Sequence, residues 1–114
     1  MKALGEFEQL ILFAVLKLDG DAFGVRIRQE IERRTGREVS AGAIYTTLER
    51  LENRGYVAGR RDDVSRGRGR PRRYYTLQPE GVSALHRSYS QLKEMARGLG
   101  SKLEELARHG SGTA

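Results

Sequence analysis

The sequence contains no cysteine and no tryptophan, and it has only two prolines and two histidines in 114 residues. Without cysteine the chain has no disulfide framework and no thiolate metal site, and a reducing cytosol is the expected compartment. No serine–histidine–aspartate or paired-carboxylate arrangement can be identified, and Gly67-Arg68-Gly69 lacks the third glycine of a nucleotide-binding fingerprint. The sequence therefore predicts a protein that is not an enzyme and that holds no cofactor and no metal.

Long hydrophobic runs are also missing, since the longest covers only the seven residues 10–16. A helix that spans a bilayer needs about 20 apolar residues. Glu6 and Glu8 precede this run, where a secretory signal would carry basic residues instead. These features predict a soluble, cytoplasmic protein that does not bind a membrane.

Positive charge is concentrated in one short segment of the chain. The net charge is +6 and the pI is near 10.1, and residues 60–73 hold seven arginines against two aspartates. Glycine and proline are interleaved with five of these arginines, so the guanidinium groups project from an extended or turning backbone. Arginine binds phosphate through two hydrogen bonds, and a solvated loop is the alternative interpretation. A basic chain of this kind favours nucleic acid as its partner.

The first half of the chain predicts three helices. Apolar residues recur with helical spacing at about 7–18, 23–35 and 41–53. Ser40 is a suitable N-cap for the third helix, and Gly55 is a suitable stop. The first helix is apolar nearly all round, so part of its cover is expected from a second subunit.

Short segments rich in β-branched and aromatic residues follow the third helix. Residues 56–61 and 72–77 flank the arginine-rich segment and predict an antiparallel hairpin with a long tip. Its inward-facing residues are expected to be Val57, Tyr75 and Leu77. With a further short strand at residues 38–39, the order of elements is that of a winged helix-turn-helix. The predicted fold class is therefore mainly α with a small β-hairpin, and residues 1–78 form the DNA-binding domain.

A last helix is predicted for residues 79–108, opened by Pro79 and followed by a disordered tail at 109–114. Its apolar residues alternate at spacings of three and four, the pattern of a coiled-coil seam. They are Val82, Leu85, Tyr89, Leu92, Ala96, Leu99, Leu103 and Leu106. This pattern predicts a C-terminal dimerisation helix, with Leu12, Phe13 and Leu16 of the first helix also in the interface. A helix folded back on its own domain is the alternative, and Gly98 and Gly100 favour a bend or a pause.

The third helix suits the major groove of DNA. Its first turn, residues 41–43, is slim, while Thr46 and Thr47 offer hydroxyls and methyls to base edges and Arg50 reaches a guanine or a phosphate. Tyr45 either donates to a phosphate or is a half-buried rim aromatic. The expected DNA contacts from this helix are Ser40, Ala41, Gly42, Ala43, Tyr45, Thr46, Thr47 and Arg50.

The hairpin is expected to contact the DNA backbone through arginine. The residues are Arg66, Arg68, Arg70, Arg72 and Arg73. Residues 68–71 also resemble the core of an AT-hook, which lies in the minor groove of A·T-rich DNA, but backbone contact is the favoured interpretation.

Several segments resemble the PadR-type transcriptional regulators, the phenolic-acid decarboxylase repressor family. They are Leu4-Gly5-Glu6-Phe7-Glu8, Ala22-Phe23-Gly24-Val25, residues 40–52, Gly55-Tyr56-Val57, residues 72–77 and Gly81. The resemblance implies a winged-helix regulator, and the short last helix is similar to that of a smaller branch whose members form two-fold dimers by exchanging it. Phe23 and Thr46 depart from the family, since many members have tyrosine and proline there, so operator preferences of relatives do not transfer.

The resulting hypothesis is a homodimeric repressor that binds double-stranded DNA at an inverted-repeat operator. A non-specific or architectural DNA-binding protein and an interaction adaptor that no longer binds DNA are the alternatives. Some members of the family bind aromatic acids or drug-like cations between the dimer helices. The resemblance thus implies a small aromatic effector near Phe7, Phe13, Tyr89 and Met95, with plain core packing as the alternative.

Overall fold

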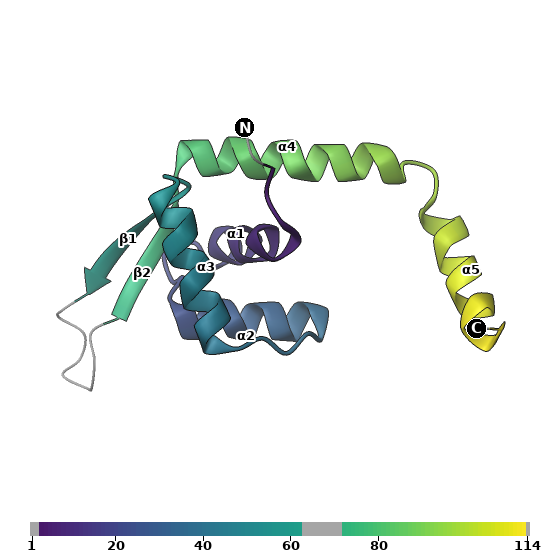
Figure 1. The fold of residues 1–114 in the computed structure, drawn as a ribbon, viewed down its shortest axis with the longest axis horizontal. Coiled ribbons are helices and arrows are strands. Elements are labelled where there is room, and N and C mark those ends of the chain that lie inside the picture. Colours follow the sequence, from purple (N-terminus) through teal and green to yellow (C-terminus); the bar gives the residue numbers. More distant parts are fainter. Residues whose placement is uncertain (1–2, 63–71, 114) are drawn as a thin grey trace.

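A computed structural model describes residues 3–62 and 72–113 of the chain. The elements in order are α1 (Glu6–Leu18), α2 (Gly24–Thr35), α3 (Ala41–Asn53), β1 (Val57–Asp62), β2 (Arg72–Leu77), α4 (Pro79–Ala96) and α5 (Gly100–Thr113). The first three helices pack together, the hairpin lies beside α3, and α4 passes over α1 before leading to α5 (Figure 1). The predicted class, mainly α with a two-stranded hairpin, is confirmed.

The ends of α3 follow from its local sequence. The Ser40 hydroxyl accepts a hydrogen bond from the Ala43 amide at 3.0 Å, which satisfies one of the free donors at the start of the helix. At the other end Gly55 adopts a φ of 79°, and the Tyr56 amide donates to the Leu51 carbonyl at 3.0 Å. A glycine in the left-handed region closes a helix in this way without steric strain. Both predicted caps are confirmed.

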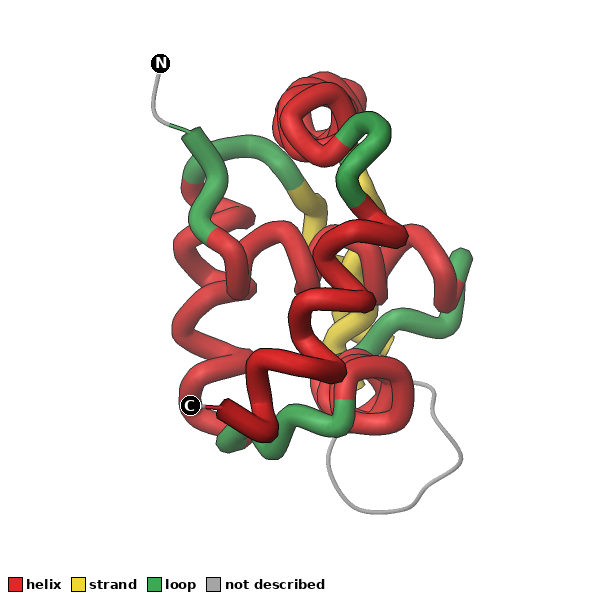
Figure 2. Tube along the Cα trace, turned by 90° about the vertical axis from the view of Figure 1, so that its right-hand side faces the viewer, coloured by secondary structure: helices red, strands yellow, loops and turns green. Residues whose placement is uncertain are grey.

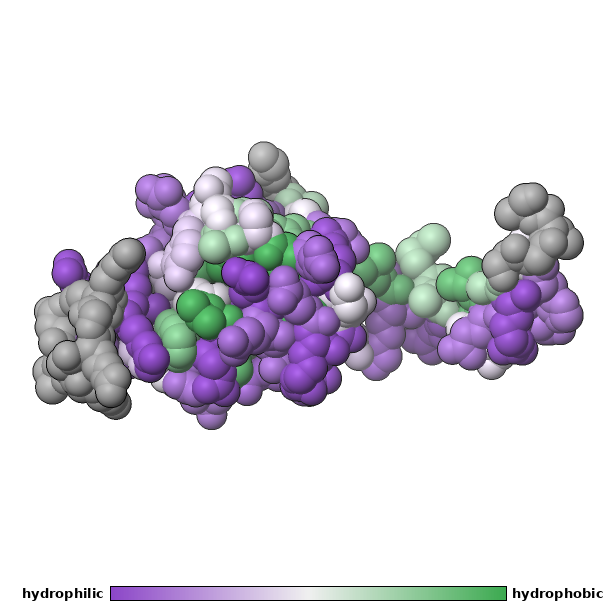
Figure 3. Space-filling view, turned by 90° about the horizontal axis from the view of Figure 1, so that it is seen from below, coloured by the Kyte–Doolittle hydropathy of each residue, from purple (hydrophilic) through white to green (hydrophobic). Residues whose placement is uncertain are grey.

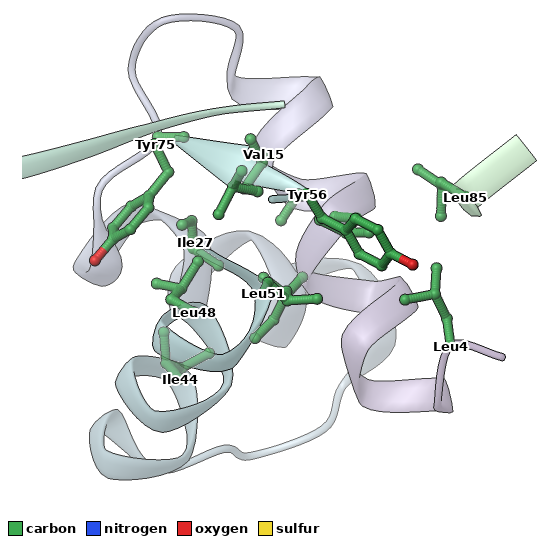
Figure 4. Close-up of a cluster of buried hydrophobic side chains, with 14 of the residues drawn as sticks. Leu4, Val15, Ile27, Ile44, Leu48, Leu51, Tyr56, Tyr75 and Leu85 are labelled. Carbon is green, nitrogen blue, oxygen red and sulfur yellow. The ribbon is translucent and has the colours of Figure 1, made fainter. Parts of the chain in front are cut away.

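One hydrophobic core joins the three helices to the hairpin and to the start of α4 (Figure 4). Its fully buried side chains are Ile11, Leu12, Ile27, Ile44, Leu48, Leu51 and Val57. Leu12 and Leu85, predicted for the dimer surface, are only 0% and 4% exposed and belong to this core, so that prediction is wrong for them. Leu12 is buried because α1 is covered on two sides within the protomer, by α2 and α3 and by α4.

The hairpin pairs Val57 with Leu77 and Asp62 with Arg72 in antiparallel register. Val57 and Tyr75 are buried and Leu77 packs against the core, as predicted. Residues 38–39 do not form a strand, so that prediction is wrong. Phe23 bridges Tyr74 instead, and the Tyr75 amide donates to the Ala22 carbonyl at 2.8 Å. The turn before α2 thus occupies the outer edge of β2 that a third strand would otherwise cover.

The last two helices form an arm that projects from the winged helix. The radius of gyration of 16.8 Å exceeds the value of about 13 Å expected for a compact chain of this length. The last helix, predicted for residues 79–108, is divided in two, because α4 ends at Ala96 and Gly98 takes a φ of 78°. The bend or pause expected at Gly98 and Gly100 is therefore confirmed. In Figure 2, α4 is seen end-on while α5 runs across the view, so the chain turns sharply between them. The predicted disordered tail is also corrected, since α5 continues to Thr113.

Most of the residues predicted for the dimer surface are exposed in the protomer. They are Phe13, Leu16, Val82, Tyr89, Leu92, Ala96, Leu99 and Leu103. Apolar surface continues along the arm beyond the body of the molecule (Figure 3). Within residues 3–62 and 72–113, no helix is both long enough and apolar enough to cross a membrane.

Candidate nucleic-acid interface

The outward face of α3 is open to a ligand along most of its length. The residues of α3 and its N-cap that were predicted for DNA contact and are exposed are Ser40, Ala41, Gly42, Ala43, Tyr45, Thr46 and Arg50. Apart from the backbone of α3 itself, no atom of the described residues lies within 4 Å of the position that a Cβ on Gly42 would take, so other described segments do not cover the first turn there. Thr47 is only 5% exposed and faces the core, so its predicted contact with base edges is wrong. Spacing alone placed Thr47 on the flank of the helix, and packing covers that flank.

Tyr45 is held against the first turn of α2. A Cβ added to Gly24 would lie 2.3 Å from the Tyr45 Oη and 2.5 Å from its Cε1, so the ring fits only because residue 24 has no side chain. Tyr45 is nevertheless 47% exposed. The ring is thus a half-buried aromatic at the rim, as one interpretation has it, and donation by its hydroxyl to a phosphate stays a prediction.

Arg50 lies near a buried carboxylate. Its Nη1 is 3.6 Å from Glu8 Oε2, and the Arg54 Nη1 is 3.5 Å from the same oxygen. The other oxygen of Glu8 accepts from the Gly5 amide at 2.8 Å, at the start of α1. Glu8 thus joins α1 to the last turn of α3, and the Arg50 side chain, 53% exposed, is drawn toward α1 rather than standing alone in solvent.

At the base of the hairpin, arginine and aromatic side chains are stacked. The Arg72 Cζ lies 4.3 Å from the centre of the Phe23 ring, and Phe23 meets Tyr74 edge-on at 5.3 Å. The Arg60 Cζ lies 5.2 Å from the Tyr74 ring. Planar guanidinium groups stack well on aromatic faces, which fixes the direction of Arg72 without neutralising its charge. Arg66, Arg68 and Arg70, predicted for backbone contact, lie outside the described residues.

Arg73 differs from its neighbour because it is paired with a carboxylate. Its Nη2 donates to Glu52 Oε2 on α3 at 2.7 Å, and the same oxygen accepts from the Gly59 amide at 3.3 Å. The Glu52 carboxylate raises the pKa of the Arg73 guanidinium above its ordinary value. Burial raises the pKa of the Tyr75 phenol, which lies beside this pair, and the Arg73 charge partly offsets that effect. The Arg73 side chain is still 46% exposed, so what distinguishes it from Arg72 is its carboxylate partner, which the sequence alone does not reveal.

A cleft of about 650 Å³ connects these elements on one face of the winged helix. Its lining residues are Asp21, Phe23, Gly24, Val25, Arg26, Gln29, Tyr45, Arg72 and Arg73. Sequence reasoning missed the contribution of α2, because the helical spacing of Arg26 and Gln29 indicated only a solvated face. Arg26 is paired with Asp21 at 2.8 Å. Arg72, which also lines the cleft, stacks on Phe23 and donates to the neutral Tyr74 hydroxyl at 3.5 Å.

The four residues predicted for an effector site do not enclose one pocket within the protomer. Phe13 and Tyr89 meet edge-on with ring centres 6.2 Å apart, while Met95 is 77% exposed. Phe7 packs against the core and lies under the Arg37 guanidinium at 5.9 Å. A separate groove of about 430 Å³ between α1 and α2 is lined by Leu10, Phe13, Ala14, Leu16, Lys17, Glu30, Ile31, Arg34 and Thr35. Within the described ranges no cluster of acidic or histidine side chains is placed to hold a metal ion.

Comparisons with known proteins agree with this geometry. A family model described as the transcriptional regulator PadR-like family matches residues 12–87. The chain is 38% identical over 79 residues to transcriptional regulator Rv3488 of Mycobacterium tuberculosis, a match that covers 69% of this chain and 70% of that protein.

Solved structures share the fold. A PadR family transcription regulator from Clostridium difficile R20291 superposes with a TM-score of 0.72 at 22% identity, covering 87% of this chain and 99% of that chain. A PadR family transcriptional regulator from Eggerthella lenta DSM 2243 gives a TM-score of 0.64 at 26% identity, covering 87% of each chain.

Proposed function

The chain belongs to the PadR-like family of transcriptional regulators, and we propose that it acts as a homodimeric repressor on an inverted-repeat operator. The family consists of DNA-binding regulators rather than enzymes. Such a protein would repress by covering DNA and so excluding the transcription machinery from it. We propose that it acts in the cytoplasm.

The observation that supports this proposal most directly is the open face of α3 beside the arginine-lined cleft. A helix with a slim, exposed first turn fits the major groove, where the edges of all four base pairs can be distinguished. Thr46 lies on that face and Tyr45 on its flank. We propose that Arg72 and the α2 side of the cleft contact the phosphates that border the same groove. Backbone contacts would then fix the position of the protein on the duplex, and base contacts from α3 would read the sequence.

The proposed homodimer rests on the uncovered apolar surface of the arm. Leu92 is 61% exposed, Met95 77% and Leu103 68%, and Phe13 and Leu16 on α1 are exposed as well. Contiguous apolar surface of this kind on a small protein marks an interaction site. A two-fold pair joined through the arms would present two copies of α3. Successive major grooves on one side of a duplex are about 34 Å apart, which sets half-sites about ten base pairs apart.

The test begins with duplex fragments selected from genomic DNA by the purified protein. Fluorescence anisotropy then compares the best fragment with random duplex at physiological salt, and a specific regulator should prefer its site by about 10³-fold or more. Thr46→Ala should change which fragments bind best. Thr47→Ala is the matched control, because it removes the same groups from a neighbouring but buried residue and should leave the ranking unchanged.

Each other outcome identifies an alternative. Equal binding of selected and random duplex would indicate an architectural DNA-binding protein. Absence of binding to either duplex would indicate an adaptor. A sedimentation experiment that finds only monomer at micromolar concentration, with the selected duplex still bound, would refute the homodimer.

We also propose that a small aromatic effector binds where two copies close over Phe13 and Tyr89. The edge-on contact between these rings leaves Tyr89 47% exposed and Phe13 39% exposed on the apolar surface. Such a molecule should release the selected duplex, and Tyr89→Ala should abolish the release when measured at a protein concentration at which sedimentation shows that the variant is still a dimer. Release that is unaffected by Tyr89→Ala would place the effector elsewhere.

A further inference from the structure

Two adjacent arginines at the base of the hairpin have different surroundings. Arg72 stacks on Phe23 with its guanidinium 4.3 Å from the ring centre, whereas Arg73 donates to the Glu52 carboxylate at 2.7 Å. Successive side chains of a strand point to opposite faces, so only one of the two can face α3. Arg72 also donates to the neutral Tyr74 hydroxyl at 3.5 Å, so no carboxylate compensates it in the contacts found among the described residues. A charge already compensated by a carboxylate gains less from a phosphate than a charge whose partners are an aromatic ring and a neutral hydroxyl.

Gly59 makes the contact between Arg73 and Glu52 possible. A Cβ on Gly59 would lie 2.5 Å from the Arg73 Nε and 2.7 Å from its Cζ. The Arg73 side chain therefore crosses β1 directly over residue 59 to reach α3. The Gly59 amide donates to the same Glu52 oxygen at 3.3 Å, so α3, β1 and β2 meet at one carboxylate.

This junction lies between the buried base of the hairpin and its tip. A two-stranded hairpin is marginally stable by itself, and the direction of its outer part depends on what the strands touch. Val57 and Tyr75 attach the base to the core. Glu52 binds Gly59, which pairs with Tyr75, and Arg73, which lies one pair further toward the tip on the same face of the hairpin. Glu52 belongs to the same helix as Thr46, so any tilt at the junction changes where the hairpin lies relative to the base-contacting residues.

We propose that Glu52, Gly59 and Arg73 form a strut that sets the angle between the hairpin and α3, and that Arg73 is a positioning residue rather than a phosphate ligand. This inference rests on the proposed DNA-binding function. The strut keeps the hairpin and the exposed face of α3 aligned with the same groove of the DNA. Its loss lowers discrimination between sites more than it lowers affinity for DNA in general, because random duplex does not require that register.

The variants separate the effect of the hairpin's position on DNA binding from the effect of side-chain charge. Glu52→Gln removes the carboxylate that accepts from Arg73, and Glu49→Gln is its control. Glu49 lies one turn earlier on the exposed face of the same helix, and no ion pair of Glu49 is found in the described parts of the chain. Gly59→Ala leaves all charges unchanged and displaces only the flexible end of Arg73. Arg73→Ala and Arg72→Ala complete the set, and urea midpoints confirm that each variant folds.

Affinities for the selected duplex and for random duplex are measured by anisotropy over a range of salt concentrations. We expect Glu52→Gln and Gly59→Ala each to lower the ratio of the two affinities about tenfold, comparable with the discrimination of one base pair. Glu49→Gln should shift both affinities by the same factor. Arg72→Ala should reduce the slope of log affinity against log salt by about 0.9, the value for one phosphate contact, while Arg73→Ala leaves it unchanged.

A readout without DNA distinguishes failure of this inference from failure of the proposed function. Hydrogen exchange at the Gly59 amide should accelerate in Glu52→Gln and not in Glu49→Gln, whether or not any duplex binds. The inference is overturned if Arg73→Ala lowers the salt slope as much as Arg72→Ala does. It is equally overturned if Glu52→Gln and Glu49→Gln give the same affinity ratio or the same exchange rate. If exchange changes as expected but the wild-type protein binds no duplex, the strut stands as structure and its role in DNA discrimination is refuted.

Discussion

Replacing Gly81 by alanine tests how the arm is attached to the winged helix. Gly81 is the third residue of α4, and a Cβ there would lie 2.2 Å from the Tyr56 carbonyl oxygen and 3.0 Å from the Leu77 Cδ1. The Tyr56 carbonyl also accepts from the Gln78 amide at 2.9 Å, so it is held in place from the side of α4. A side chain can rotate away from such a collision, but a hydrogen-bonded carbonyl cannot.

The expected change in stability is the sum of two opposing effects. Alanine in place of glycine within a helix stabilises it by up to about 1 kcal/mol. Overpacking in a closely packed region costs about 1 to 3 kcal/mol, or more where the backbone has to move. Since α4 must shift by about 1 Å to relieve a 2.2 Å contact, the second effect should dominate. We expect the free energy of unfolding to fall by about 2 kcal/mol, and Tm by about 8 °C for a chain of this length.

Urea denaturation at one fixed protein concentration measures this change, because self-association alone can alter apparent stability. Gly42→Ala is the matched control. Gly42 occupies the first turn of α3, and outside the helix backbone no atom in the described part of the chain lies within 4 Å of the position of its Cβ. That variant should therefore be as stable as the wild type or slightly more stable. If the two variants had the same urea midpoint, the close packing of α4 on the Tyr56 carbonyl would be refuted.

Three further predictions concern the interface, the arm and pH. Gly24→Ala should displace the Tyr45 ring, and Tyr45→Phe should remove its hydroxyl. Each variant should weaken DNA binding about tenfold, because a hydrogen bond from the hydroxyl to a charged phosphate is lost. A change in salt slope with either variant would contradict this, because a neutral hydroxyl releases no counterion. Leu92→Glu on α4 and Leu103→Glu on α5 should each shift sedimentation toward monomer, and a dimer that persists with Leu103→Glu would exclude α5 from the interface. Burial raises the pKa of Tyr75. The free energy that the neutral Tyr75 phenol contributes to folding should therefore be fully present below the unfolded phenol pKa of about 10 and should be lost as pH rises above it. Urea midpoints between pH 8 and 11 should fall less in Tyr75→Phe, and an identical decline in both proteins would refute the assignment.

The elements of the fold could largely be predicted from the sequence because their signals are local. Ser40 and Gly55 define the ends of α3 through hydrogen bonds and backbone angles that involve only nearby residues. The alternation of the hairpin placed Val57 and Tyr75 correctly on its buried side. The interruption of the last helix was likewise predicted from a local signal, since Gly98 and Gly100 disfavour a continuous helix and Gly98 takes a φ of 78°.

The errors arose where distant segments decide exposure. Thr47 and Leu12 lie at positions whose helical spacing allowed either face, and contacts with other elements buried both. The third strand was expected next to the hairpin, yet the turn at Ala22 and Phe23 takes that edge through the Tyr75 amide.

Spacing, caps and turn residues act over a few positions, so the helices, the hairpin and the exposed face of α3 could be predicted from them. The contacts of each arginine depend on segments that are distant in the chain. Arg72 and Arg73 are identical and adjacent in the sequence, and a charge run cannot say which of them meets a carboxylate. Folding brings Glu52 across Gly59 to one of the two and leaves the other on an aromatic ring, because strand alternation sends neighbouring side chains to opposite faces.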